Sequence, residues 1–242
     1  MNLDPTDLNR RVAKAVAAYW STRQRQSTTQ RALGQRDYGA RSAVTGGAQM
    51  DGFIKLLNEL IEECGIQSRH IFHRTALELP GFFRPTKEWD LLVVRDQQLI
   101  LGLESKSQVG PSFGNNFNNR TEEAMGSAMD LWAAFREGAF NKTIRPWLGY
   151  SFLLEDCEGS RRPVKVKEPH FKVLPEFVNA SYAKRYELFC RKLVRERHYN
   201  AAALLLSAPK GGLKGAFAEP AEDLAFLAFV KSLVAHVSAY KG

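Results

Sequence analysis

The chain has 242 residues, of which 44% are hydrophobic and 25% are charged. This balance is typical of a globular protein of one or two domains, and it excludes a collagen-like, coiled-coil or wholly disordered chain. Lysine and arginine number 34 against 26 acidic residues, so the net charge of +8 favours a polyanionic partner such as nucleic acid.

The N-terminal part combines a helical pattern with a long basic segment. Residues 7–20 are predicted to form a helix because their apolar side chains fall on one stripe. Residues 10–41 contain eight basic side chains and one acid, Asp37. The middle of this run is poor in core-forming residues, so we expect a flexible or loosely packed basic arm at about residues 10–45. The arm is either a solvated face or a segment that contacts phosphates.

The remaining elements alternate between helical and strand patterns. The apolar spacing predicts helices over residues 50–64, 122–135, 183–197 and 221–240, and strands over residues 71–79, 89–94, 99–103, 147–154 and 201–206. A loop rich in glycine and asparagine is expected over residues 109–119. This order predicts one α/β domain over residues 1–242, with a mixed central sheet flanked by helices.

Several common classes of protein are disfavoured by what the sequence lacks. The N-terminus has no apolar signal-peptide core, and the apolar stretch Leu224–Val237 is short and interrupted by Lys231. We therefore expect a cytoplasmic protein with no membrane partner. The three cysteines form no C-x-x-C pair, so neither a zinc ribbon nor a disulfide framework is predicted. No G-x-x-x-x-G-K-[ST] loop is present, so the sequence does not predict an ATP-dependent activity.

The strongest chemical signal lies in the hairpin predicted over residues 89–103. Glu104 and Lys106 are two residues apart at the end of its second strand, so they share a face. Asp90 starts the first strand, and antiparallel pairing places that start beside the end of the second. We therefore expect Asp90, Glu104 and Lys106 to converge at one end of the sheet.

Two carboxylates and an ammonium group suit metal-dependent hydrolysis of a phosphodiester. Mg²⁺ takes oxygen ligands, and Asp90, Glu104 and the backbone carbonyl of Ser105 could supply them. Lys106 would orient or activate the attacking water and offset the charge that builds on phosphorus. The alternative is an ordinary Glu–Lys pair on a surface hairpin.

Longer motifs around this hairpin resemble the XhoI family of type II restriction endonucleases, within the PD-(D/E)xK nuclease superfamily. The resemblance runs from about residue 40 to 195, and it is weaker over residues 200–242. Its motifs are RPTKEWD at 84–90, ESKS at 104–107, VGPSFGNNFNNR at 109–120, GGAQMDGF at 46–53 and EDCEGSRRPV at 155–164. One departure is that Trp89, and not proline, precedes Asp90.

The resemblance implies a PD-(D/E)xK fold and a homodimeric, Mg²⁺-dependent endonuclease acting on double-stranded DNA. The implied target is the palindrome CTCGAG, cut after the first C to leave a 5′ overhang. Two alternatives remain open: a structure-specific repair or junction nuclease, and a catalytically silent DNA-binding protein.

Other polar residues are candidates for supporting roles. Asparagine and arginine pair with base edges in the major groove, so we expect DNA contacts from a cluster after the second strand: Asn115, Asn116, Asn118, Asn119 and Arg120. Arg161 and Arg162 either form a surface ion cluster or contact DNA. Asp51, Glu59 and Glu62 could each lend an acid to the site, or simply lie on a solvated helix face.

Overall fold

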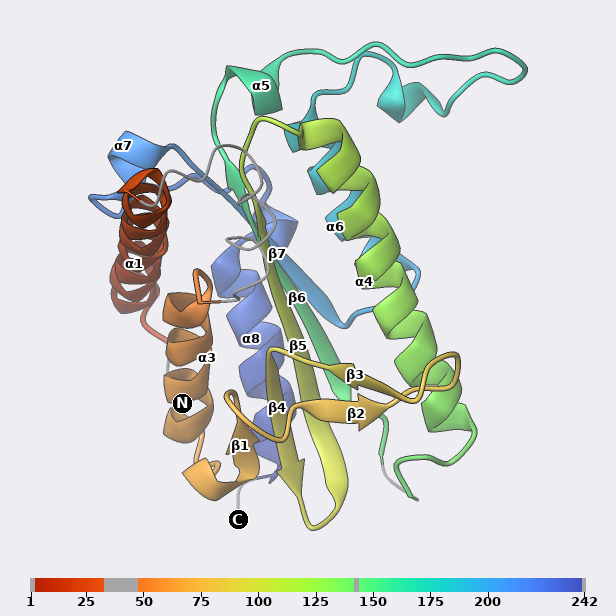
Figure 1. Cartoon of the computed structure of the whole chain (residues 1–242). Coiled ribbons are helices and arrows are strands. Elements are labelled where there is room, and N and C mark those ends of the chain that lie inside the picture. Colours follow the sequence, from red (N-terminus) through yellow and green to blue (C-terminus); the bar gives the residue numbers. More distant parts are fainter. Residues whose placement is uncertain (1–2, 33–47, 142–143, 241–242) are drawn as a thin grey trace.

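A mixed five-stranded sheet forms the centre of the protein in the computed structural model, which describes residues 3–32, 48–141 and 144–240 (Figure 1). The strand order is β1 (Ile71–Phe72), β4 (Leu91–Arg95), β5 (Gln98–Gln108), β6 (Trp147–Glu155) and β7 (Ala201–Ser207). The first three strands pair antiparallel, and β5, β6 and β7 pair parallel. The predicted α/β class with a mixed sheet is confirmed.

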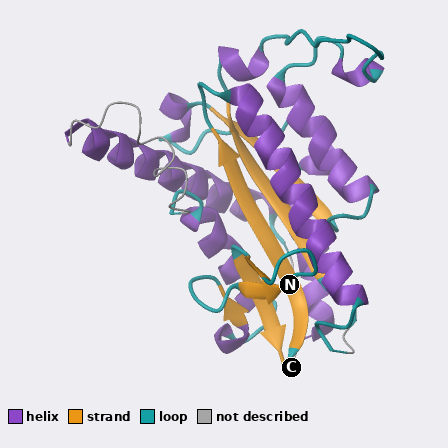
Figure 2. Cartoon of the chain, turned by 45° about the vertical axis from the view of Figure 1, so that its right-hand side comes forward, coloured by secondary structure: helices purple, strands orange, loops and turns teal. Residues whose placement is uncertain are grey.

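Helices cover both faces of this sheet (Figures 1 and 2). Helices α4 (Phe113–Arg136) and α6 (Tyr182–Arg195) lie on one face, and α1 (Pro5–Ala32), α3 (Asp51–Glu63) and α8 (Phe226–Val237) lie on the other. Each face has its own apolar core. Because β6 and β7 are buried on both faces, their sequences are almost continuously apolar.

Shorter elements join these layers. Strands β2 (Glu78–Pro80) and β3 (Thr86–Glu88) form a separate antiparallel pair. Helices α5 (Glu158–Arg161) and α7 (Pro209–Gly212) and four 3₁₀ turns complete the description: η1 (Ser68–His70), η2 (Pro175–Phe177), η3 (Glu222–Leu224) and η4 (Ser238–Tyr240). In the described part of the chain, no helix is long and apolar enough to cross a membrane.

The hairpin β4–β5 confirms the predicted pair of strands and extends the second. Asp96 and Gln97 form its turn with φ values of 50° and 60°, as in the type I′ turns that suit the twist of a hairpin. Leu91 pairs with Leu103, and β5 continues to Gln108. The edge of β5 beyond Leu103 is therefore left open on the β4 side, beside Asp90.

Four sequence predictions need correction. The polar half of the basic arm is helical as far as Ala32, because arginine and glutamine favour helices without needing a packed face; residues 33–47 lie outside the described residues. The loop over residues 109–119 becomes α4 from Phe113 onward. The strand over residues 71–79 is divided between β1 and β2, which belong to different sheets. The helix over residues 221–240 is interrupted between η3 and α8.

Tertiary packing explains why α4 starts early despite its asparagines. Asparagine and glycine have low helix propensity, so local sequence favours a loop. Phe113 and Phe117 are one helical turn apart and pack on α6: Phe113 stacks on Tyr182 with ring centroids 5.8 Å apart, and Phe117 meets Tyr186 edge-on at 5.0 Å. These contacts outweigh the local preference.

The β2–β3 pair is anchored to α4 by one buried carboxylate. Asp130, with a side chain 4% exposed, accepts hydrogen bonds from the backbone N–H groups of Phe82 (2.6 Å) and Phe83 (2.8 Å) and from Arg84 Nε (2.7 Å). Burial raises the pKa of this carboxyl, but these donors outweigh burial and hold the pKa below its usual value. The charged form of Asp130 therefore fixes the tip of this hairpin.

Replacing Asp130 by asparagine should lower the free energy of unfolding by about 2 kcal/mol at neutral pH, because charged hydrogen bonds are lost in a buried place. A folded-state pKa below the unfolded value confers stability that is present above about pH 3.9 and is lost as the pH falls through the folded pKa. Chemical unfolding of both proteins at a series of pH values should thus show a difference that shrinks in acid. Exposed Glu122→Gln on the same helix is the control. Equal stability at neutral pH would contradict this account.

Candidate active site

Asp90, Glu104 and Lys106 meet where β4 begins beside β5. Asp90 Oδ2 accepts hydrogen bonds from the backbone N–H of Ser105 (2.7 Å) and from Lys106 Nζ (2.9 Å). Lys106 Nζ also lies 4.0 Å from Glu104 Oε1. The structure therefore brings together the three residues that sequence spacing placed at this end of the sheet.

Glu104 is a buried carboxylate that two further residues hold in place. Only 2% of its side chain is exposed. Lys87 on β3 forms an ion pair with Glu104 Oε1, and its Nζ also donates to the Glu88 carbonyl at 2.6 Å. On the other side, the Tyr199 hydroxyl lies 3.1 Å from Glu104 Oε2 and 3.0 Å from the Ala124 carbonyl.

Lys87 and Tyr199 were missed by sequence reasoning. Lys87 lies in a short charged segment with no apolar pattern to indicate which way its side chain points. Tyr199 is 95 residues from Glu104, and only the parallel pairing of β5, β6 and β7 brings it to the site. The nearest signal in the sequence is the position of Tyr199 just before a predicted buried strand.

The electrostatics of the cluster keep Lys106 and Tyr199 protonated. Burial disfavours the Lys106 ammonium, but the carboxylates of Glu104 and Asp90 outweigh burial and raise the pKa of Lys106 above its usual value. Burial and the neighbouring Glu104 carboxylate hold the pKa of Tyr199 well above its usual value. Lys106 is thus a cation near neutral pH, suited to orienting a water molecule or stabilising negative charge.

The donor set at this site fits a hard divalent cation. Asp90 and Glu104 provide carboxylate oxygens, and the Asp90 side chain is 32% exposed, so a cation can reach it. The Ser105 N–H points to the open β4 side of β5, and the carbonyl of the same residue points to the same side in an antiparallel strand. Within the described ranges, no three or more His, Cys, Asp or Glu side chains lie together so that they alone could hold a metal ion. Two carboxylates and a carbonyl suit Mg²⁺, which keeps several waters.

The three acids weighed as possible helpers of the site, or else as part of a solvated helix face, lie elsewhere. Asp51, Glu59 and Glu62 belong to α3, whose core is on the other face of the sheet from the side chains of Glu104 and Lys106. Glu59 already pairs with Arg11 of α1 at 3.1 Å. This placement favours a solvated helix face with structural ion pairs.

The five polar residues predicted to contact DNA lie on the first two turns of α4. Asn115, Asn118 and Asn119 are exposed and Asn116 is half-buried, and no side-chain amide of the four bonds to another described residue. Arg120 pairs with Glu123 at 2.5 Å, and its positive charge acts to lower the pKa of Lys106, so Arg120 lies near the site.

The two consecutive arginines after β6 differ. Arg161 forms two hydrogen bonds with Asp156, at 2.6 and 3.0 Å. Arg162 is exposed and makes no ion pair within the described residues. Arg162 is therefore the freer of the two for binding an anion.

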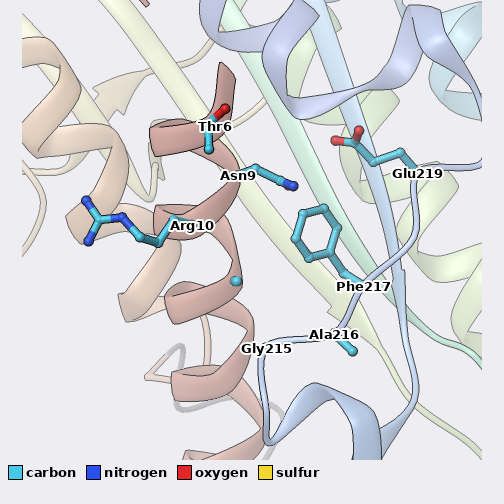
Figure 3. A pocket seen from close by; sticks show the side chains of 8 residues that line it. Thr6, Asn9, Arg10, Gly215, Ala216, Phe217 and Glu219 are labelled. Carbon is cyan, nitrogen blue, oxygen red and sulfur yellow. The ribbon is translucent and has the colours of Figure 1, made fainter. Parts of the chain in front are cut away.

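An open hollow elsewhere on the surface carries no comparable chemistry (Figure 3). It lies between the start of α1 and residues 215–219, and its lining includes Arg10, Phe217 and Glu219. Arg10 is paired with Asp7, and Glu219 accepts a hydrogen bond from the Phe226 N–H at 2.7 Å. Its charged groups are thus used structurally.

Comparison with known proteins decides the family. Residues 29–219 match the family described as restriction endonuclease XhoI. The chain belongs to the XhoI family of restriction endonucleases. It is 56% identical over 208 residues to a protein named type II restriction enzyme BstVI from Geobacillus stearothermophilus, covering 84% of this chain and 93% of that protein.

Two further relatives in the XhoI family agree. Type II restriction enzyme XhoI from Xanthomonas vasicola is 44% identical over 80% of this chain and 78% of its own length. Type II restriction enzyme AbrI from Azospirillum brasilense is 46% identical over 71% of this chain and 78% of its own length. No solved structure matches the chain. The resemblance found in the sequence is confirmed, and the chain is a site-specific deoxyribonuclease by its family.

Tyr199→Phe should slow DNA cleavage about 10-fold or more, because Glu104 loses a hydrogen bond to a charged group in a buried place. The matched control is Tyr150→Phe. Tyr150 pairs with Glu104 across β5 and β6, and its buried hydroxyl has no hydrogen-bond partner within the described part of the chain. Single-turnover cleavage by both variants is the measurement. Equal rates for the two variants would show that the Tyr199 hydroxyl does not position Glu104.

Proposed function

We propose that the protein cuts both strands of duplex DNA in a Mg²⁺-dependent reaction at the palindrome CTCGAG, after the first C, leaving a 5′ overhang. The observation that carries the catalytic part is the convergence of Asp90, Glu104 and Lys106 at the β4–β5 junction. The target and the position of the cut are those that membership of the XhoI family implies. The cell compartment that fits this role is the cytoplasm, where the DNA substrate is found.

Each residue of the cluster has a distinct task in this proposal. Asp90, Glu104 and the Ser105 carbonyl would hold the cation, which when bound polarises the scissile phosphate and lowers the pKa of a bound water. Lys106, held as an ammonium, orients the attacking water and offsets negative charge on the phosphate. Tyr199 and Lys87 keep Glu104 in a fixed orientation.

The start of α4 supports recognition of the bases. Its exposed asparagines, Asn115, Asn118 and Asn119, have free amides that could pair with adenine edges, and Asn116 lies between them. Arg120 lies closer to Lys106 and could reach a phosphate or a guanine. The N-terminal end of a long helix is also favourable for an anion such as DNA phosphate.

A palindromic target is most simply read by a twofold assembly in which each subunit cuts one strand. We therefore propose a homodimer. Sedimentation velocity should show a species of twice the 27.2 kDa chain mass, free or on target DNA. A strict monomer in both conditions would contradict the twofold arrangement.

Digestion of a plasmid of known sequence in Mg²⁺, followed by sequencing of the product ends, tests the proposed activity. We expect ends only at CTCGAG, with the 5′ overhang stated above. Ends scattered at branched or mismatched structures would favour a repair or junction nuclease instead. Binding without any product would favour a catalytically silent DNA-binding protein.

Lys106→Ala should abolish cleavage and leave duplex binding nearly intact. The reason is that Lys106 serves the water and the scissile phosphate, whereas affinity comes from many phosphate contacts. Cleavage and gel-shift assays on the same preparation measure both effects. Lys55→Ala removes an exposed lysine on α3 and is the control. Wild-type turnover by Lys106→Ala would overturn the assignment of the site.

A further inference from the structure

Between α5 and α6 the chain leaves the body of the protein in a loop of residues 162–179, here called the projecting arm (Figure 1). None of its residues is buried. Phe171 is 88% exposed and Leu174 is 64% exposed. Apolar side chains that stand clear of the protein are a mark of an interaction surface.

The projecting arm has a fixed base. Arg185 of α6 donates from Nη2 to the Val164 carbonyl at 3.2 Å and from Nε to the Ala180 carbonyl at 3.1 Å. One guanidinium thus holds the two ends of the arm together. Within the arm, Glu168 accepts a hydrogen bond from the Val173 N–H at 2.9 Å. A shape set in advance lowers the entropy cost of binding a partner.

The base of the projecting arm also contacts the start of α4. The Arg185 guanidinium lies 5.2 Å from the centre of the Tyr182 ring, and Tyr182 stacks on Phe113 at the start of α4. Glu155 at the end of β6 accepts a hydrogen bond from the Gly110 N–H, just before α4, at 2.7 Å. The arm therefore projects from the same end of the protein as the start of α4 (Figures 1 and 2).

The charge of the projecting arm matches a polyanion. Arg162, Lys165 and Lys167 are exposed and make no ion pair with any residue that the structure describes. Lys172 is different because it bonds to Glu168 at 3.1 Å. Three such cations on the same arm as an exposed aromatic ring suit a duplex, in which cations neutralise phosphates and an apolar side chain contacts bases in a groove.

We propose that the projecting arm binds the DNA duplex beside the scissile phosphate. Arg162, Lys165 and Lys167 contact backbone phosphates, and Phe171 enters a groove. This inference rests on the proposed DNA cleavage and adds to it a recognition element outside the catalytic cluster. The contacts of Arg185 at the base hold this element in a fixed position relative to the start of α4.

The first test is the double variant Lys165→Ala/Lys167→Ala. Binding of target and unrelated duplexes is measured in Ca²⁺, used in place of Mg²⁺, at several salt concentrations. Each lost phosphate contact lowers the slope of log affinity against log salt by about 0.9, so a fall of about 1.8 is expected for both duplexes. The control Lys55→Ala/Lys231→Ala removes equal charge from α3 and α8, and it should keep the wild-type slope.

The second test is Phe171→Ala, which leaves the charge unchanged. The slope should stay at the wild-type value, and affinity for the target should fall roughly 10-fold, the scale of one lost base contact. Thermal unfolding of both variants should match that of the wild type, because no arm side chain is buried.

Two results would overturn the role of the projecting arm. One is a wild-type slope in the double variant together with wild-type affinity in Phe171→Ala. The other is dissociation of a dimer by the arm variants with an unchanged slope, which would make the arm a contact between subunits. In either case wild-type cleavage at the target would leave the proposed function standing. Failure of the wild type to cleave, with the expected slopes intact, would instead contradict the proposed function alone.

Discussion

The site depends on a carboxylate, Glu104, that is buried on the face of a central strand and needs a partner of opposite charge. The ion pair with Lys87 supplies that partner. Burying such a charge without a partner costs several kcal/mol. Its partners come from three places in the chain: Lys87 on β3, Lys106 on β5 and Tyr199 before β7. The outlying β2–β3 pair, which Asp130 fastens to α4, is therefore part of the architecture that makes a buried Glu104 tolerable.

The charged groups of the cluster also compensate one another. Two carboxylates and two ammonium groups balance one another, so the cluster is neutral as a whole. The carboxylates of Asp90 and Glu104 lie on either side of Lys106 Nζ, 2.9 and 4.0 Å away, near the edge of β5 that β4 leaves open. Lys106 remains protonated beside them. A protonated Lys106 can give electrostatic support to a phosphate and its attacking water.

The convergence of Asp90, Glu104 and Lys106 was predictable from sequence because it depends on local rules. Alternation along β5 puts Glu104 and Lys106 on one face, and hairpin pairing brings Asp90 to them. The contacts of Lys87 and Tyr199 with Glu104 depend on where a separate hairpin and a parallel strand lie in the fold. No local sequence pattern predicts those positions. The start of α4 was wrongly predicted as a loop, since aromatic packing of Phe113 and Phe117 on α6 overrides the propensity of four asparagines.

Anomalous diffraction from bound Mn²⁺ would test the central claim most directly. Crystals of the wild-type protein with duplex DNA containing CTCGAG would be grown in Mn²⁺ as a stand-in for Mg²⁺. The account predicts an anomalous peak coordinated by carboxylate oxygens of both Asp90 and Glu104. A peak bound elsewhere, with Glu104 still paired to Lys87 and Asp90 to Lys106, would contradict it.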